Sequence, residues 1–141
     1  MAAISCTLLV DDDDTTNFLN QSLLRRLAVS DAVLVAGNGR EALDLLHAHC
    51  IVHASPTCPT LILLDLKMPV MDGVEFLRAY AQRPPRENPT VVVIMLTTSL
   101  HAADVAQMQG LPIAGYLTKP LTSDKITGLL QQHFGHPARK P

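Results

Sequence analysis

The chain alternates short apolar runs with stretches that have the period of an α-helix, and this alternation restricts the fold more than any other feature. The five apolar runs are Cys6–Val10, Val33–Ala36, Leu61–Leu64, Val91–Leu96 and Ala114–Leu117. Short strands that alternate strictly with helices form parallel sheets, because each right-handed crossover places its helix on a face of the sheet. The pattern predicts a doubly wound α/β fold, with a five-stranded parallel sheet flanked by helices.

Apolar side chains at helical spacing, together with residues that favour helix ends, mark the helices. The patterns at helix ends are Asn38 followed by Glu41, Asp72 followed by Glu75, Thr122 or Ser123 before the last helix, and Gly110 after the fourth. The expected apolar faces are Phe18, Leu19, Leu23 and Leu27 with Leu24 beside them; Ala42, Leu45, Leu46 and His49; Val74, Leu77 and Ala81; Ala102, Val105 and Met108; and Ile126, Leu129, Leu130 and His133.

The composition fits one globular domain and points to neither a nucleic acid nor a membrane partner. The 141 residues are 48% hydrophobic and carry a net charge of -2, and a chain of this length buries a core without metals or disulfides. No apolar run approaches the roughly 18 residues that span a bilayer, and residues 1–10 lack a basic leader. We expect a cytoplasmic domain over residues 1–135 and a tail at 136–141, with no direct nucleic acid binding and no membrane insertion.

The cysteines and histidines near the middle of the chain raise the question of a zinc site. The residues concerned are His47, His49, Cys50, His53 and Cys58. Their spacing matches no compact zinc pattern, so we favour an ordinary helix end followed by a long exposed loop from Cys50 to Pro59. Reduced thiols are expected, because an odd number of cysteines in a chain without a leader does not suggest a disulfide framework. The sequence gives this loop no role.

Polar groups follow the ends of several predicted strands. They are Asp11–Asp14 after the first strand, Asp65 after the third, Thr97–Ser99 after the fourth and Lys119-Pro120 after the fifth. Because the carboxyl ends of parallel strands share one edge of the sheet, these groups are expected to meet there. On its own segment alone, Asp65 could equally be a carboxylate that caps a turn, and the run of acids could be a solvated loop.

Carboxylates that meet at one edge repel one another, so such a site favours a bound cation. Oxygen ligands suit Mg²⁺, which holds few protein carboxylates and keeps waters for a phosphate-bearing partner. Lys119 and Thr97 add an ammonium and a hydroxyl, groups that stabilise a phosphoryl during transfer. An EF-hand is excluded, because the glycine and distal glutamate of that loop are absent after Asp11. Asp13 and Asp14 are expected to cap the first helix.

Over nearly its full length the chain resembles a receiver domain of a two-component response regulator, of the CheY-like type. The matching segments are LLVDD at 8–12, LILLDLKMPVMDG at 61–73, VVVIMLTTS at 91–99 and GYLTKP at 115–120. Their order and spacing match as well as their letters. The resemblance implies a flavodoxin-like sheet with strand order 2-1-3-4-5, in a signalling switch that is not an enzyme. The gap between Asp12 and Asp65 is longer than usual, which leaves the second helix and the following loop less well defined.

The resemblance also implies a role for each matching residue at the phosphorylation site. Asp65 would be the phosphoacceptor, and Asp12 and Asp65 would bind Mg²⁺ directly. Asp11 would act on the metal mainly through water, and the backbone carbonyl of Lys67 would add a ligand. Thr97 and Lys119 would contact the phosphoryl group, with a cis peptide bond between Lys119 and Pro120.

Signalling partners and a conformational switch follow from the same resemblance. The phosphoryl donor would be a sensor histidine kinase or a histidine phosphotransfer protein. Thr97 would follow the phosphoryl group and Tyr116 would turn inward, which changes the face formed by the fourth helix, fifth strand and fifth helix for a downstream target protein. Lys67 and Ser99 would flank the path of the attacking water and tune the phosphorylation lifetime. For Tyr116, a half-buried aromatic on an edge strand is the simpler interpretation.

Two other functions fit part of the sequence. Asp11-x-Asp13-x-Thr15 after an apolar strand satisfies the nucleophile motif of haloacid-dehalogenase-like phosphatases, with Asp11 phosphorylated and Asp13 as the general acid. That hypothesis leaves the Asp65 segment unexplained and lacks the further acidic pair that the phosphatases need. The second alternative is a degenerate receiver that binds partners independently of phosphorylation, which the complete set of site residues argues against.

Overall fold

Five parallel strands form one sheet in the order β2-β1-β3-β4-β5. The computed structural model describes residues 4–50, 60–82, 91–98, 106 and 108–134 of the chain. The strands are β1 (Ile4–Val10), β2 (Ser30–Ala36), β3 (Thr60–Asp65), β4 (Val91–Thr97) and β5 (Gly115–Thr118). The predicted doubly wound sheet and its strand order are confirmed.

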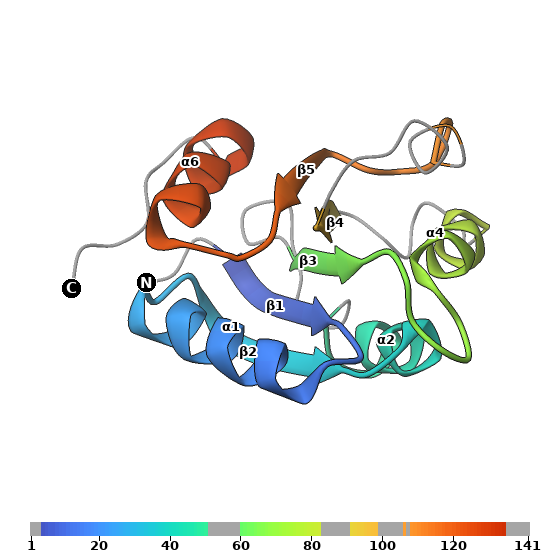
Figure 1. Cartoon of the computed structure of the whole chain (residues 1–141), viewed down its shortest axis with the longest axis horizontal. Helices are drawn as coiled ribbons and strands as arrows, with labels where there is room; N and C mark the ends of the chain where they lie inside the picture. The colour runs from blue at the N-terminus through green and yellow to red at the C-terminus, as the bar shows by residue number, and fades with distance from the viewer. Residues whose placement is uncertain (1–3, 51–59, 83–90, 99–105, 107, 135–141) are drawn as a thin grey trace.

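Helices cover both faces of the sheet (Figure 1). One face carries α1 (Asp14–Arg26) and α6 (Ser123–Phe134), and the other carries α2 (Gly39–Leu45), the short π-helical segment η1 (Leu46–Cys50) and α4 (Gly73–Ala81). Each face has its own hydrophobic cluster, because the strands are buried on both sides. None of the described helices combines the length and the hydrophobicity that crossing a bilayer requires.

The register of the strands aligns their carboxyl ends along one edge of the sheet. Val10 of β1 pairs with Leu64 of β3, and Asp65 pairs with Leu96 of β4. Thr97 pairs in turn with Thr118, the last residue of β5. The residues that follow these strands therefore leave the sheet at neighbouring points, as the sequence predicts.

The predicted helix starts are confirmed by hydrogen bonds to backbone N–H groups. Asp13 accepts from Thr16 N, Asn38 from Glu41 N, Asp72 from Glu75 N, and Thr122 from Lys125 N, at 2.9 to 3.2 Å. Glu75 returns the contact by accepting from Asp72 N at 3.1 Å, which completes a capping box. Most of the predicted fourth helix and the tail at 136–141 lie outside the described residues.

The buried face of α1 differs from the predicted one. Phe18 and Leu19, which were expected to face the core, are 66% and 60% exposed, whereas Asn17 and Asn20 are buried. The physical reason at Asn17 is a partner outside the helix, since its side-chain Nδ2 donates to the backbone carbonyl of Asp11 at 2.7 Å. A pattern of apolar residues does not reveal a polar side chain that is buried because it satisfies a backbone group elsewhere.

Candidate functional site

Three carboxylates lie together at the carboxyl edge of the sheet. Asp11 and Asp12 follow β1, and Asp65 ends β3. One carboxylate oxygen from each lies within 4.8 Å of the others. Among the described residues, this is the one group of three or more acidic, histidine or cysteine side chains that lie close enough to share a metal ion. Asp11 is buried and Asp12 is exposed, so the cluster opens to solvent on one side.

Lys119 joins two of these carboxylates. Its Nζ donates to Asp11 Oδ2 at 2.7 Å and to Asp65 Oδ1 at 3.2 Å. The three side chains are only 6% to 20% exposed, so solvent screens these ion pairs less than it screens surface pairs. A single ammonium faces three carboxylates, and the site keeps a net negative charge.

The pKa values of Asp65 and Lys119 are both raised, which disfavours the charged form of the carboxyl and favours the charged form of the amine. Burial of the Asp65 carboxyl and the nearby charge of Asp11 raise its pKa, and together they outweigh the opposing effect of Lys119. Burial alone would lower the pKa of Lys119, but its hydrogen bonds and ion pairs with Asp11 and Asp65 outweigh burial and raise it. Lys119 therefore stays charged at neutral pH, and Asp65 carries an electrostatic strain that a further cation would relieve.

Asp11 is held by contacts on both its backbone and its side chain. Asp13 N donates to Asp11 Oδ1 at 3.0 Å, and the Asn17 amide donates to the Asp11 carbonyl. The amide oxygen of Asn17 is buried and has no hydrogen-bond partner among the residues that the structure describes. Sequence reasoning missed Asn17, and a polar residue one helical turn after the acids is the signal that could have found it.

Asp13 serves the helix rather than the acidic cluster. Its Oδ2 accepts from both the backbone N–H and the hydroxyl of Thr16, and these hydrogen bonds lower the pKa of its carboxyl. The expected capping role is confirmed. The phosphatase hypothesis requires Asp13 to be a general acid, and a carboxyl that accepts two hydrogen bonds and has a lowered pKa is poorly suited to donate a proton.

The turn after Asp65 is fixed at both ends by close backbone contacts. Gly73 N donates to the Leu66 carbonyl at 2.8 Å, and a Cβ on Gly73 would lie 2.6 Å from the Asp65 carbonyl oxygen. Gly39 N, at the start of α2, donates to the Met71 carbonyl at 2.8 Å, and a Cβ on Gly39 would also collide there. Lys67 lies exposed inside this anchored turn.

Val70 occupies a strained position in the same turn. Its φ is 67°, in the left-handed region that is unfavourable for a β-branched residue, and its side chain is 80% exposed. We expect Val70→Asn to raise the free energy of unfolding by about 1 kcal/mol, because asparagine tolerates this conformation and no packing is lost. Urea unfolding measures the change. Val70→Thr keeps the β-branch, so an equal gain from threonine would show that strain is not the cause.

Two further residues predicted for the site, Thr97 and Tyr116, lie on β4 and β5. Thr97 is buried at the end of β4, and its carbonyl accepts from Lys119 N at 2.8 Å. The peptide bond between Lys119 and Pro120 is cis. Tyr116 lies on β5, paired with Met95, and is 39% exposed. Ser99, His53 and Cys58 lie outside the described residues, as do the side chains of His49 and Cys50.

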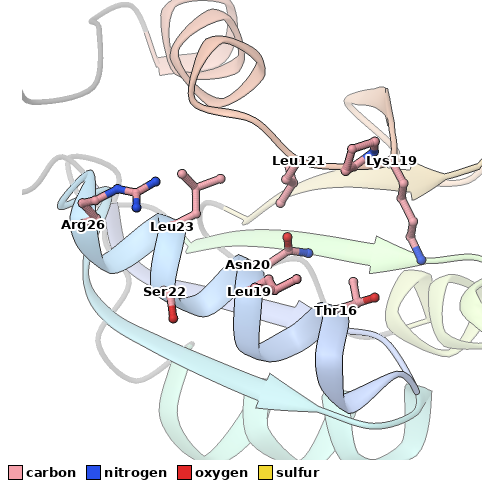
Figure 2. Close-up of a pocket in the computed structure, with 9 residues that line it drawn as sticks. Thr16, Leu19, Asn20, Ser22, Leu23, Arg26, Lys119 and Leu121 are labelled. Atoms are coloured by element: carbon pink, nitrogen blue, oxygen red, sulfur yellow. The ribbon is translucent and has the colours of Figure 1, made fainter.

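A groove of about 390 Å³ lies between α1 and the segment from Lys119 to Leu121. Figure 2 shows Leu19, Asn20 and Leu23 of α1 on one side, with Leu121 and Lys119 on the other. The exposed Leu19, which was expected in the core, is part of this lining. The groove therefore combines apolar side chains with part of Lys119, the residue whose ammonium contacts Asp65.

The fold and the site define a known class of protein. The family model of the response regulator receiver domain matches residues 7–131, so the chain belongs to this family. It is a CheY-like signalling domain of two-component systems rather than a classical enzyme, and such a system implies a kinase partner. The acidic group of Asp11, Asp12 and Asp65 is typical of the receiver Mg²⁺ site.

Similar proteins come from several lineages. Response regulator Rcp1 of Synechocystis is 34% identical over 112 residues, which are 79% of this chain and 74% of Rcp1. The transcriptional regulatory protein LnrK of Bacillus subtilis is 31% identical over 91% of this chain, but the chain spans only 53% of LnrK. Among solved structures, a two-component response regulator from Cytophaga hutchinsonii has a TM-score of 0.76 at 26% identity, covering 94% of this chain and 98% of that one. Chemotaxis protein CheY4 of Vibrio cholerae has a TM-score of 0.72 at 26% identity, covering 92% and 98%.

Proposed function

We propose that this chain is a phosphoacceptor receiver domain that takes a phosphoryl group onto Asp65. The observation that carries the proposal is the joint contact of the Lys119 ammonium with Asp65 and Asp11. This contact brings the Asp65 carboxylate, an ammonium and the buried Asp11 carboxylate together at the open edge of the sheet, and Asp65 would be the nucleophile. This is the arrangement that phosphoryl transfer needs, because positioning and charge stabilisation supply most of the catalysis.

The donor set fits Mg²⁺. Three carboxylates with one ammonium leave excess negative charge, and the raised pKa of Asp65, due to burial and to Asp11, marks a carboxylate that lacks sufficient positive charge. Asp12, Asp65 and the Lys67 carbonyl would hold the ion directly, with Asp11 acting through water. When bound, the ion would supply positive charge to the oxygens of the incoming phosphoryl group.

The chain's own residues perform the transfer as follows. A carboxylate oxygen of Asp65 attacks the phosphorus of a phosphohistidine on a kinase or phosphotransfer protein. The new O–P bond forms as the N–P bond breaks, and the donor imidazole keeps the electron pair and takes up a proton. Lys119 and Thr97 donate hydrogen bonds to the phosphoryl oxygens. The product is an acyl phosphate, which water hydrolyses, so the switch resets.

The groove along α1 is suited to the phosphoryl donor. Its lining includes Lys119, whose ammonium contacts Asp65, together with the apolar side chains of Leu19, Leu23 and Leu121. An amphipathic helix that carries the donor histidine could lay its apolar face there and bring the phosphoryl group to Asp65. The support for this assignment is that the exposed Leu19 lines the same groove as Leu23 and Leu121, which offers an apolar helix face a continuous contact.

The output would pass through Thr97 and Tyr116. Thr97 would move toward the phosphoryl group, and the partly exposed Tyr116 would turn inward behind it. This movement changes the face made by β5, α6 and the segment before β5, which would bind a downstream target protein. Residues 1–135 would form the working domain, in the cytoplasm, and residues 136–141 a tail.

Beryllofluoride with Mg²⁺, which imitates the phosphoryl group, tests this function against its rivals. A change in tyrosine fluorescence or NMR signals is expected in the parent, retained in Asp11→Asn and lost in Asp65→Asn. The reverse result would favour the phosphatase with Asp11 as nucleophile. The absence of any response would favour a receiver that works without phosphorylation.

Lys67 is proposed to set the lifetime of the phosphorylated form. Its side chain is exposed in the turn after Asp65, where only its backbone carbonyl would bind Mg²⁺. Lys67→Ala is therefore expected to change the dephosphorylation rate by about tenfold, while leaving Mg²⁺ affinity within about twofold. The decay of radiolabelled phosphoprotein and a Mg²⁺ titration measure the two effects. Equal decay rates for variant and parent would contradict the assignment. Ser99 is proposed to act on the same water path.

A further inference from the structure

Lys125 reaches back from the first turn of α6 to the loop that carries Lys119. Its Nζ donates to the carbonyl of Thr118 at 2.7 Å and to the carbonyl of Pro120 at 3.0 Å. A third contact joins it to the Thr118 hydroxyl at 3.3 Å. The two carbonyls belong to the residues on either side of Lys119, so one ammonium binds the backbone both before and after the lysine of the site.

The position of Lys125 in its own helix does not explain its presence. A positive charge in the first turn of a helix is unfavourable, because the helix dipole places partial positive charge there. The start of α6 already has a negative charge from Asp124 and a cap from the Thr122 hydroxyl, which accepts from the Lys125 N–H at 3.2 Å. The three oxygens of the preceding loop are the contacts that hold the ammonium, and charge-assisted hydrogen bonds of this kind are strong.

The backbone of Lys119 is also fixed from the opposite side. Its N–H donates to the carbonyl of Thr97, at the end of β4, at 2.8 Å. The main chain of Lys119 is thus held between the sheet and α6, while its side chain extends to Asp11 and Asp65. The position of that backbone decides where the Lys119 ammonium can reach, and misplacement of a catalytic group by about 1 Å can slow a reaction by up to about a hundredfold.

We propose that Lys125 is a positioning residue for phosphoryl transfer, which keeps the Lys119 ammonium aligned with Asp65 by binding the carbonyls of Thr118 and Pro120. This inference rests on the proposed function of Asp65 and Lys119. It also gives α6, which forms part of the proposed output face, a direct connection to the phosphorylation site through one side chain.

Two variants at the start of α6 separate an effect on the position of Lys119 from a general effect on the stability of the fold. Lys125→Met removes the three contacts with the loop and keeps the length of the side chain. Thr122→Ala removes the cap of α6 and touches neither carbonyl beside Lys119. Urea midpoints are measured first, so that the comparison is made at matched stability. Two readouts follow: the rate of phosphorylation by acetyl phosphate with Mg²⁺, and the hydrogen-exchange rate of the Lys119 amide by NMR.

The expected result is a difference between the variants in both readouts. Lys125→Met should phosphorylate about tenfold more slowly than the parent and exchange the Lys119 amide about tenfold faster than Thr122→Ala does. Thr122→Ala should phosphorylate at the parent rate. Equal phosphorylation and exchange in the two variants would overturn the inference while leaving the proposed function intact. If the parent itself takes up no phosphoryl group, the proposed function fails, and the exchange comparison alone still decides whether Lys125 holds Lys119.

Discussion

Replacing Asp65 with asparagine is expected to abolish phosphorylation and, at the same time, to stabilise the fold at neutral pH. The amide has nearly the shape of the carboxylate but cannot form an acyl phosphate. It also removes the charge that burial and Asp11 disfavour, as the raised pKa of Asp65 indicates. Function and stability should therefore change in opposite directions, as occurs where a site keeps unfavourable charge for its chemistry.

The pH dependence of this stabilisation has a definite sign. A carboxyl whose pKa is higher in the folded than in the unfolded state destabilises the fold once it ionises. The destabilisation begins as pH rises through the unfolded value of 3.8 and is complete above the folded pKa. The advantage of Asp65→Asn should be full at pH 7 and shrink as pH falls toward 3.8, measured by urea unfolding without Mg²⁺.

Asp44→Asn is the matched control, because Asp44 is exposed on α2 and belongs to no described acidic cluster. It should be phosphorylated like the parent and change stability by less than about 0.5 kcal/mol. Two results would contradict the prediction for Asp65→Asn: uptake of a phosphoryl group from acetyl phosphate, or a lower free energy of unfolding than the parent at pH 7.

Lys119→Met is expected to separate metal binding from catalysis. Without its ammonium, Asp11 and Asp65 lose the cation that competes with Mg²⁺ for their oxygens, so Mg²⁺ affinity should rise by about tenfold. Phosphorylation by acetyl phosphate should nevertheless slow by about a hundredfold to a thousandfold, because one donor to the phosphoryl oxygens is gone. In the absence of Mg²⁺ the variant should lose about 3 kcal/mol of stability, since a partly buried ion pair is broken from one side.

Calorimetric Mg²⁺ titration, phosphorylation rates and urea unfolding in the presence of a chelator measure these three effects. Arg40→Met, which removes an exposed positive charge from α2, is the control and should leave all three nearly unchanged. Weaker Mg²⁺ binding in Lys119→Met than in the parent would show that the ammonium does not compete with the metal for Asp11 and Asp65.

The parallel sheet and the edge at which the acids gather could be predicted from local patterns, whereas the order of the strands was implied by the resemblance to receiver domains. Apolar runs mark the strands, and the acid that ends the run at Leu61–Leu64 is the residue that the fold places beside Asp11. Strand boundaries were less accurate. β2 begins at Ser30, three residues before the predicted run, because an edge strand pairs on one side only and tolerates the exposed Asp31 and Ala32.

The supporting contacts of the site could not be predicted, because each joins residues that the chain pattern does not relate. The burial of Asn17 depends on the Asp11 carbonyl, and the place of Lys125 depends on the carbonyls of Thr118 and Pro120. In α2 and at its C-cap, Ala42 and Leu46 are buried and Leu45 packs partly buried against the core, as predicted, but Leu43 is buried as well. Positions 42, 43 and 46 share one face of a regular α-helix, and the apolar pattern alone does not show that this face extends to Leu43.

The two hydrophobic clusters of the fold give the phosphorylation site two independent supports. Lys119 is tied to α6, which belongs to the cluster on one face, and the turn after Asp65 is tied through Gly39 to α2, which belongs to the other. Damage to one cluster can therefore misalign the lysine without moving the metal-binding turn, or the reverse. If Lys119 acts on the phosphoryl group and the turn after Asp65 holds the metal, as proposed, sequence change in the helices of one face would alter one of these two functions more than the other.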